Sequence, residues 1–566
     1  MNKIWLRPFW VVLLVGCPLL SFSQQPAWEE EEGDIEDAQV LIEKDRAIEL
    51  PTANRNFERI PPLPLQSATD ARLSYDFENF SPGLPALTPQ IRVLKIKEPP
   101  LAKLYGNYVK AGFGNYITPY LEGYFNNTLN DEFSHEIHFK HLSSRNGPVD
   151  AANSGSGETR IDLGAKRFAA NHTFNAGLHY QREKYHFYGY APGLEIERDS
   201  IKQIFNTLGV EGSIERNKEL ALLDYTLRAS FTHLSDDYNA AENQAGFNLQ
   251  ASYELSKLAT IHLQSDLYLT HRKDGMNAEN IVTLNRNLFR LKPYLQYKTS
   301  IGNNMQIDLN AGFNIVHEND TLDNANQLHF YPYVLAKYHF TPSLKIYAGI
   351  DGDIERTSLQ KFAGENPYLA PNVPLFHTNK NFAFQGGIEG RLGSVVGFDA
   401  GFSVSNYKNL YFFANSMQDS TKFTVLYDQG NTTILNIFGE VSIAAHEDFR
   451  LTARADYFGY STDEVEEAWH RPNFTIDLLS TYNLYDKLLL TANLYTLGGI
   501  QGINLASNTT KKLDTIADLG FTTEYLFSEK LSAFLQLKNI FAKEYERYLN
   551  YPSRGFMLLA GVTLSF

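Results

Sequence analysis

Leu223-Asp224-Tyr225-Thr226-Leu227-Arg228-Ala229-Ser230-Phe231 is the kind of stretch that decides the fold of this chain. Every second residue is apolar, from Leu223 to Phe231, and the residues between them are Asp, Thr, Arg and Ser. Successive side chains of a β-strand point to opposite faces of the sheet. The stretch therefore predicts a strand with one apolar face and one polar face.

The same alternation recurs through the chain from Leu104 onward, for example at 307–314, 450–457 and 488–495. No helical pattern accompanies these strands, so no helix is available to cover so many apolar faces. Lipid can cover them instead, as in outer-membrane barrels. No segment after the amino-terminal leader is long and apolar enough for a spanning helix, so a membrane-crossing chain of this kind must use strands.

The spacing of the strands points to the same architecture, because short and long connections alternate. Short turns are expected at Asn127–Asp131, Ala169–His172, Glu215–Glu219, Leu255–Leu258, Ser300–Asn304, Thr341–Ser343, Gly393–Val395, His446–Asp448, Tyr485–Lys487 and Ser528–Lys530. Long polar loops are expected at Ser143–Thr159, Lys184–Ser200, Arg272–Asn280, Thr357–Lys380, Lys408–Gly430, Ser461–Pro472 and Gly498–Thr515. Outer-membrane barrels have short periplasmic turns and long outer loops. The chain is therefore predicted to be all-β, a transmembrane antiparallel β-barrel of about 22 strands in a Gram-negative outer membrane.

The carboxy terminus fits this scheme. Residues 556–566 alternate again, and the chain ends on Phe566. An amphipathic last strand that ends in an aromatic residue is typical of outer-membrane barrels, so 556–566 is predicted to be the final strand.

The amino terminus has the pattern of a signal peptide, predicted at residues 1–23. Lys3 and Arg7 supply positive charge ahead of the apolar run at 9–20. An alternative is a lipoprotein signal, in which Cys17 would be acylated, because the residues before it resemble a lipobox.

Residues 24–100 differ from the rest of the chain. An acidic run covers 29–37, and nine prolines lie between 51 and 100. This composition predicts an extended periplasmic tail ahead of a barrel at 101–566. The tail has three possible roles: a solvated leader, a docking segment for a periplasmic partner, or a strand-like plug inside the lumen.

Composition narrows the class of partner and chemistry. The 566 residues carry a formal net charge of −15, which argues against nucleic acid as a partner. The single cysteine, Cys17, lies in the leader, which excludes a disulfide, a cysteine nucleophile or a cysteine-based zinc site from the mature chain. The expected partners are outer-membrane lipid and either a periplasmic or a cell-surface protein.

Histidines are the candidate residues for a catalytic site at the barrel rim or for a metal site. The candidates are His135, His138, His141, His179, His186, His317 and His470. No Gly-x-Ser-x-Gly elbow stands out, and His135 and His138, three apart on a strand, face opposite sides. We therefore expect no enzyme activity and no catalytic, cofactor-binding or metal site.

Alternation also predicts which charged residues face the lumen. Those expected to face the lumen are Lys140, Arg228, Arg391, Arg450, Arg454, Lys538, Glu136, Asp224, Asp266, Asp308, Asp351, Glu389, Glu440 and Glu524. They form a ladder of paired charges that braces the wall, a substrate path, or a seat for a plug-like segment. Two aromatic segments, 185–190 and 409–413, are interpreted as an outer aromatic girdle, with a docking face as the alternative.

Two carboxy-terminal segments carry a family resemblance. Leu537-Lys538-Asn539-Ile540-Phe541-Ala542-Lys543-Glu544-Tyr545 is similar to the penultimate-strand motif of TonB-dependent receptors, and Tyr551-Pro552-Ser553-Arg554-Gly555 looks like the segment before their last strand. The segment 102–190 resembles plug-less relatives of these receptors in the Bacteroidota. The chain departs from true receptors because 24–100 shows no folded-plug pattern and no clear TonB box. The resemblance implies a transport or receptor role. The alternative is a non-transport barrel subunit of an envelope assembly or secretion complex.

Overall fold

The computed structural model describes residues 106–566 except 128–129, 131, 217–221, 276–281, 302–304, 321–324 and 447. The predicted signal peptide at 1–23 and periplasmic segment at 24–100 lie outside the described residues, as does the expected start of the barrel at 101–105.

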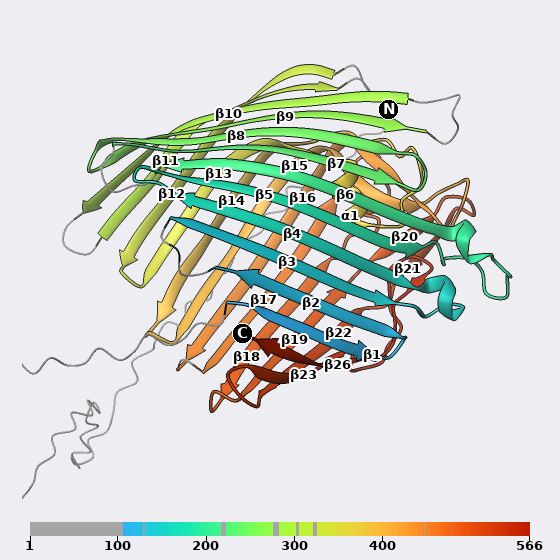
Figure 1. The fold of residues 1–566 in the computed structure, drawn as a ribbon. Helices are drawn as coiled ribbons and strands as arrows, with labels where there is room; N and C mark the ends of the chain where they lie inside the picture. The colour runs from blue at the N-terminus through green and yellow to red at the C-terminus, as the bar shows by residue number, and fades with distance from the viewer. Residues whose placement is uncertain are drawn as a thin grey trace, which may run out of the picture. The chain divides into compact units, whose positions relative to one another are not determined.

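A closed antiparallel β-barrel of 22 strands accounts for nearly all of the described chain (Figure 1). The wall strands are β1 Tyr108–Gly114, β2 Thr118–Asn126, β3 Phe133–Ser144, β4 Ser156–Phe168, β5 His172–His186, β6 Lys202–Arg216, β7 Leu223–Asp236, β8 Ala241–Ser256, β9 Ala259–Asp274, β10 Val282–Ile301, β11 Met305–Asp320, β12 Ala325–Thr341, β13 Leu344–Glu355, β14 Thr378–Leu392, β15 Val396–Asn415, β16 Phe423–Ala445, β17 Phe449–Ser461, β18 Phe474–Leu484, β19 Leu488–Gly498, β22 Ile516–Leu526, β23 Leu531–Lys538 and β26 Met557–Ser565. Each strand pairs with the next wall strand in the sequence, and β1 pairs with β26 to close the ring. The predicted fold class and strand number are confirmed.

The two ends of the barrel differ as the spacing predicted. At one end, the turn end, neighbouring strands are joined by short turns, such as Pro342-Ser343 between β12 and β13. At the other, the loop end, the connections are mostly long, such as residues 356–377 between β13 and β14. The β19–β22 connection carries a hairpin of its own, β20 Gln501–Asn504 and β21 Thr509–Lys512.

One expected loop was wrong. Lys408–Gly430 is mostly strand, because β15 continues to Asn415 and β16 begins at Phe423, which leaves 416–422 as the connection. The two strands remain paired beyond the point where the loop was expected to start, from Leu410 opposite Asp428 to Asn415 opposite Phe423. This pairing satisfies the backbone, and the apolar side chains of the extension are buried rather than solvated, on one face against residues 356–377 and on the other against Trp469 and Ile503.

The outer face carries the apolar residues. Phe231, Phe247, Leu269, Phe313 and Phe330, on strands β7, β8, β9, β11 and β12, are all 42–60% exposed. In water such a band would be a large unfavourable surface, and in a bilayer it is the lipid-facing band of the barrel. No helix in the described part of the chain is long and apolar enough to cross a membrane.

The closing seam is packed through glycines. Gly112 of β1 lies directly opposite Gly561 of β26, and blue β1 runs beside dark red β26 in Figure 1. The ring of Phe534 from β23 covers both glycines: a Cβ on Gly112 would lie 2.9 Å from it, and one on Gly561 would lie 2.6 Å from it. The Lys110 ammonium sits over the same ring, 4.2 Å from its centroid. The two glycines therefore make room for an aromatic ring across the junction of the first and last strands.

Replacing Gly561 by valine is expected to weaken this seam. The new side chain would meet both the Ala111 carbonyl oxygen and the Phe534 ring, and such overpacking costs about 1–3 kcal/mol. The measurement is the temperature at which the folded, fast-migrating band is lost in gel electrophoresis. The control is Gly439→Val in β16, where a Cβ has no neighbour within 4 Å. Equal melting of the two variants would contradict the packing argument.

Candidate functional site

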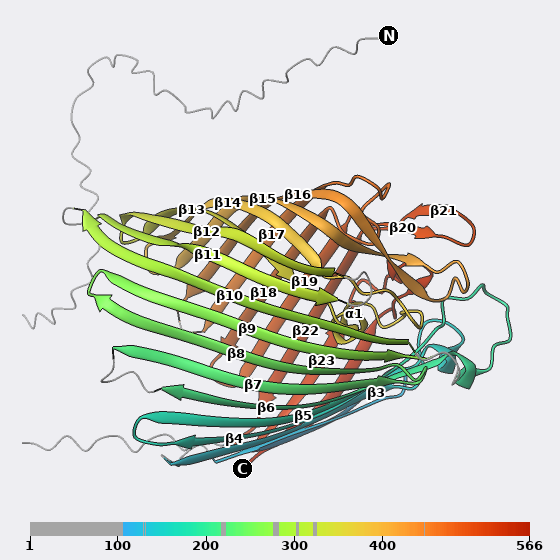
Figure 2. The same ribbon diagram turned by 90° about the horizontal axis from the view of Figure 1, so that it is seen from above.

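Residues 356–377, here called the strap, enter the lumen at the loop end. The strap contains α1, Leu359–Glu365, which lies between the near and far walls of the barrel (Figure 2). The helix begins at Ser358, whose hydroxyl accepts from the Lys361 amide. The buried carboxylate of Glu242 on β8, 2% exposed, accepts from the Leu359 amide at 2.9 Å. A wall residue thus supplies a second cap for the helix, at the end where free amides favour a negative charge.

Two buried arginines fix the strap to the wall. Arg286 of β10 is 1% exposed, and its guanidinium bonds Asp320 at 2.7 Å on the wall side. On the strap side it donates to the Thr357 carbonyl at 3.1 Å and to His377 Nδ1 at 2.9 Å. Arg272 of β9 bonds Asp274 and donates to the backbone of the strap in the same way. Buried charges of this kind are tolerated only when they are paired and hydrogen-bonded.

The opposite side of the strap packs into an aromatic core, here called the loop-end cluster. Its members are Tyr188, Tyr190, Phe205, Leu234, Ala240, Leu359, Phe362, Ala363, Leu369, Val373, Leu375, Tyr411, Phe413, Phe423, Val425, Tyr548 and Tyr551. The rings of Tyr368 and Tyr551 stack with centroids 3.7 Å apart, and the Tyr411 hydroxyl bonds Glu365 at 2.6 Å. The cluster joins β6 to β16, which lie ten strands apart on a ring of 22, so it crosses the lumen.

The interpretation of the two aromatic segments as an outer girdle was wrong. Phe187 and Tyr188 of the first segment, and Tyr411, Phe412 and Phe413 of the second, are all buried at the loop end. They form neither a lipid-facing belt nor an exposed docking face. Alternation identified them as aromatic positions near the rim but did not distinguish contact with lipid from contact with folded-in loops.

His470, in the connection between β17 and β18, joins three loops. Its Nδ1 donates to the Phe413 carbonyl at 2.8 Å, and its Nε2 accepts from the Leu549 amide at 3.2 Å. Its own carbonyl accepts from Arg547. Burial lowers the pKa of His470 to about 4, although the bond to Phe413 opposes that shift. The imidazole is therefore neutral at pH 7, as the bond from the Leu549 amide requires.

Acid is expected to loosen the loop-end cluster. The folded pKa of His470 is below its ordinary value of 6.5, so the opened loops bind a proton that the closed loops exclude. The stabilisation is complete above pH 6.5 and is lost as pH falls toward about 4. The ratio of closed to open loops should fall roughly twentyfold between pH about 7 and about 5. His377 of the strap adds to this trend, because burial and the neighbouring Arg286 hold its pKa well below the usual range.

The measurement is hydrogen exchange at the Leu549 amide, corrected for intrinsic rates. His470→Asn removes the titrating group and should flatten the acid dependence at this amide. An unchanged dependence in that variant would assign the effect to other groups.

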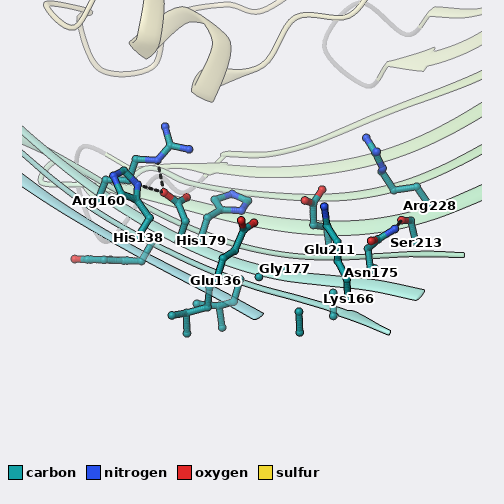
Figure 3. Close-up of a pocket in the computed structure, with 18 of the residues that line it drawn as sticks. Glu136, His138, Arg160, Lys166, Asn175, Gly177, His179, Glu211, Ser213 and Arg228 are labelled. Carbon is teal, nitrogen blue, oxygen red and sulfur yellow. Dashed lines mark hydrogen bonds and ion pairs between the residues drawn. The ribbon is translucent and has the colours of Figure 1, made fainter. Parts of the chain in front are cut away.

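Below the strap lies a polar chamber of about 1110 Å3, lined mainly by β3–β7 and reached by Gln360 of α1. Figure 3 shows its charged and polar side chains rising from these strands: Glu136, His138, Arg160, Lys166, Asn175, His179, Glu211, Ser213 and Arg228. His138 bridges two carboxylates, with Nδ1 3.2 Å from Asp162 and Nε2 3.0 Å from Glu122. In the described ranges, Lys166, Glu211 and Arg228 form no ion pair, so charges of both signs are available to a solute.

Glycines on this wall leave space for the side chains of neighbouring strands. A Cβ on Gly209 would overlap the ring of its cross-strand neighbour His179, and one on Gly164 would lie 2.6 Å from Glu136. Both side chains line the chamber and lie close against the neighbouring strand. The lining of the chamber therefore combines acidic, basic and imidazole groups.

Elsewhere on the wall, many of the charges expected to face the lumen form pairs. Ion pairs join Lys110 to Glu524, Lys140 to Glu158, Arg290 to Asp266, Lys380 to Asp351, Lys345 to Glu389 and Arg454 to Glu440. This matches the paired-ladder interpretation for these residues. The paired-ladder interpretation does not hold throughout the chamber, where Lys166, Glu211 and Arg228 form no ion pair in the described ranges.

The candidate histidines are dispersed. His138 and His179 face the chamber. His186 is buried at the end of β5, and His470 is buried in a loop. His317 bonds Asn326 on the outer face. Within the described ranges, no group of three or more His, Cys, Asp or Glu residues could hold a metal ion.

One serine and histidine do meet, on the outer face of β3. His141 Nε2 lies 3.1 Å from the Ser143 hydroxyl, and its Nδ1 lies 2.8 Å from the Thr159 hydroxyl. The third group is a hydroxyl instead of the carboxylate that would stabilise an imidazolium. The backbone around Ser143 is paired with β4, which leaves no evident oxyanion hole. The geometry falls short of a hydrolytic site.

Sequence reasoning missed the anchors of the strap. Glu242 and Arg286 were not singled out, because each looks like one more polar residue on an alternating strand, and Arg272 was placed at the start of an expected loop although β9 continues to Asp274. The signal that could have found the strap is its composition: 359–376 holds Leu, Phe, Tyr and Val among three prolines, which is too apolar for a solvated loop.

Similar folds occur among solved structures. The FrpB iron transporter from Neisseria meningitidis is 10% identical over 82% of this chain and 82% of its own, with a TM-score of 0.63. The ferric-catecholate import receptor Fiu from E. coli K12 is 9% identical over 81% of this chain and 82% of its own, with a TM-score of 0.61. The ferripyoverdine receptor of the Pseudomonas aeruginosa outer membrane is 13% identical over 81% and 71%, with a TM-score of 0.58. No protein-family model matches the sequence, and no curated protein matches it either.

These findings define the class of protein by its fold: a closed, 22-stranded antiparallel β-barrel with an apolar outer face. More particularly, the chain shares the barrel fold of TonB-dependent siderophore receptors, the architecture that its carboxy-terminal motif predicted.

Proposed function

We propose that this protein is an outer-membrane receptor or transporter whose passage is closed by its own strap. The observation that carries the proposal is the loop-end cluster, which crosses the lumen directly above a polar chamber. In this proposal, residues 1–23 are a signal peptide, 24–100 form a periplasmic segment in place of a folded plug, and 101–566 form the barrel. The role is binding and passage of a solute, not catalysis.

The chemistry of the strap suits a reversible closure. Its contacts with Arg272, Arg286 and Glu242 are hydrogen bonds to charged groups, and water can replace them when the strap leaves the wall. The aromatic side loses apolar contacts on opening, which keeps the closed state favoured without a ligand. Free charges of both signs in the chamber argue against a pore selective for ions of one sign.

The structural neighbours include receptors for iron complexes and one in complex with pyocin S2, a protein. By analogy, the ligand of this barrel enters from the loop end and is either a small solute or a protein at the cell surface.

The proposal is tested by asking whether the chamber opens in living cells. Arg228→Cys places the only cysteine of the mature barrel in the chamber, since Cys17 lies in the leader. A membrane-impermeant maleimide too large for general diffusion pores should label it slowly. Met417→Cys, 70% exposed in a loop-end connection, should label at once and serves as the control. No labelling at position 228 in intact cells would overturn the transport proposal.

The second candidate is a barrel subunit of an envelope assembly or secretion complex. One observation favours it: the loop-end cluster is as well packed as a protein core, with Phe362, Leu375 and Phe423 fully buried. A permanently closed barrel would leave Arg228→Cys unlabelled, and the protein would then be expected to co-purify with assembly factors.

A further inference from the structure

Four cations gather on the outside of the barrel at the loop end. Arg182 and Lys184 lie on the outer face of β5, Lys202 begins β6, and Arg198 belongs to the short helix η2, Arg198–Ile201, just before it. Alternation fixes the orientation, because Leu178 of β5 and Leu208 of β6 share the face of Arg182 and Lys202 and are both exposed to lipid. We call these four residues the rim cations.

The rim cations are not neutralised. In the described part of the chain, none of the four forms an ion pair, whereas the charges of the lumen wall are largely paired. Lys184 feels the positive charge of Arg198, Arg182 and Lys202, and one carboxylate, Asp199, opposes them. The Nε of Arg198 is buried without a hydrogen-bond partner. A chain with a net charge of −15 thus concentrates four cations at one place, with one neighbouring carboxylate against them.

Their depth is that of the lipid headgroups. Toward the turn end, the same face of β5 and β6 carries Leu178, Leu208 and Val210, which are 38–49% exposed and suit acyl chains. At the level of the cations, the outer face changes to hydrogen-bonded polar pairs. These pairs are His141–Thr159, Tyr180–Asn206, His233–Asn243, His271–Asn285 and His317–Asn326. Polar groups on a lipid-facing surface are expected where the hydrocarbon ends.

We propose that the rim cations bind the phosphorylated headgroup of an outer-leaflet lipid. Arginine offers a planar pair of donors to phosphate, and lysine adds charge, so both act on the same anion. The acyl chains of that lipid would lie along Leu178, Leu208 and Val210. A free phosphate would use only the cations, whereas the proposed ligand uses the apolar strip below them as well.

The test is native mass spectrometry of the full-length, delipidated protein with purified lipid A as the probe. The protein should retain phosphorylated lipid A and release the same lipid after phosphatase treatment. Each cation near such a surface contributes about fivefold in affinity, so Arg182→Gln with Lys184→Gln should weaken retention roughly thirtyfold. The charge-conserving pair Arg182→Lys and Lys184→Arg should retain most of it.

The matched control removes the same charge inside the barrel. Lys337→Gln with Arg391→Gln changes one lysine and one arginine of the lumen wall and should leave lipid retention unchanged. If both double variants lose lipid retention equally, the effect depends only on net charge, and the proposed lipid site is wrong. If an equal amount of inorganic phosphate displaces the lipid, the rim cations bind free anions rather than a lipid. This result would also overturn the lipid proposal. Circular dichroism of each variant separates these outcomes from misfolding.

Discussion

Replacing residues 358–376 with a short Gly-Ser turn opens the barrel: liposomes that contain this variant lose a trapped small dye, whereas liposomes with the unmodified protein keep it. The strap supplies Leu359, Phe362, Ala363, Leu369, Val373 and Leu375 to the loop-end cluster. Without them, the remaining aromatic residues no longer have a common core across the lumen. A barrel of 22 strands is wide enough to conduct water and solutes once nothing fills it.

A matched deletion separates closure from general damage to the loops. Residues 192–195 form an exposed stretch of the β5–β6 connection, outside the loop-end cluster. Their replacement by Gly-Ser should leave dye release at background. If liposomes with the strap-less barrel also retain the dye, another part of the protein closes the lumen and the strap does not.

Replacing Arg286 by methionine destabilises the closed barrel by about 3–5 kcal/mol, because it leaves the Asp320 carboxylate in a dry site without its guanidinium. The strap also loses the donors to the Thr357 carbonyl and to His377. The expected result is a lower melting temperature together with faster hydrogen exchange at the strap amides. Adding Asp320→Asn should recover part of the loss, because the buried negative charge that the guanidinium faced is then removed.

Lys345→Met is the matched control for this prediction. Lys345 pairs with Glu389 at 2.7 Å on the water-filled wall, where both side chains are partly exposed. Such a pair contributes less than about 1 kcal/mol. If Arg286→Met and Lys345→Met destabilise the barrel equally, burial does not strengthen the contribution of the Arg286 contact to stability.

The barrel was predictable from sequence because each strand repeats one local rule. Alternation such as that of 223–231 predicts the strand and its two faces without knowledge of its neighbours. The contrast between short and long connections then predicts the pairing order and the strand number. Charge pairs such as Lys345–Glu389 also follow, since residues opposite each other on neighbouring strands are within reach.

The candidate site was not predictable by the same rules. The strap follows neither a period of two nor a helical period over its length, so its apolar residues gave no local signal of where they pack. Arg286 meets Thr357 and His377 across 71 and 91 residues of sequence, and alternation is silent on such contacts. The aromatic run at 409–413 was misassigned for the same reason: its burial depends on the strap on one face and on the connections that carry Trp469 and Ile503 on the other.

The most direct test of the account is the conductance of the purified protein in a planar bilayer, with and without residues 24–100. Both proteins should be silent apart from brief openings, because the strap and the loop-end cluster close the lumen. Large steady currents in the full-length protein would show an open pore and contradict the closure. Currents that arise only after removal of 24–100 would make that segment the closing element instead of the strap.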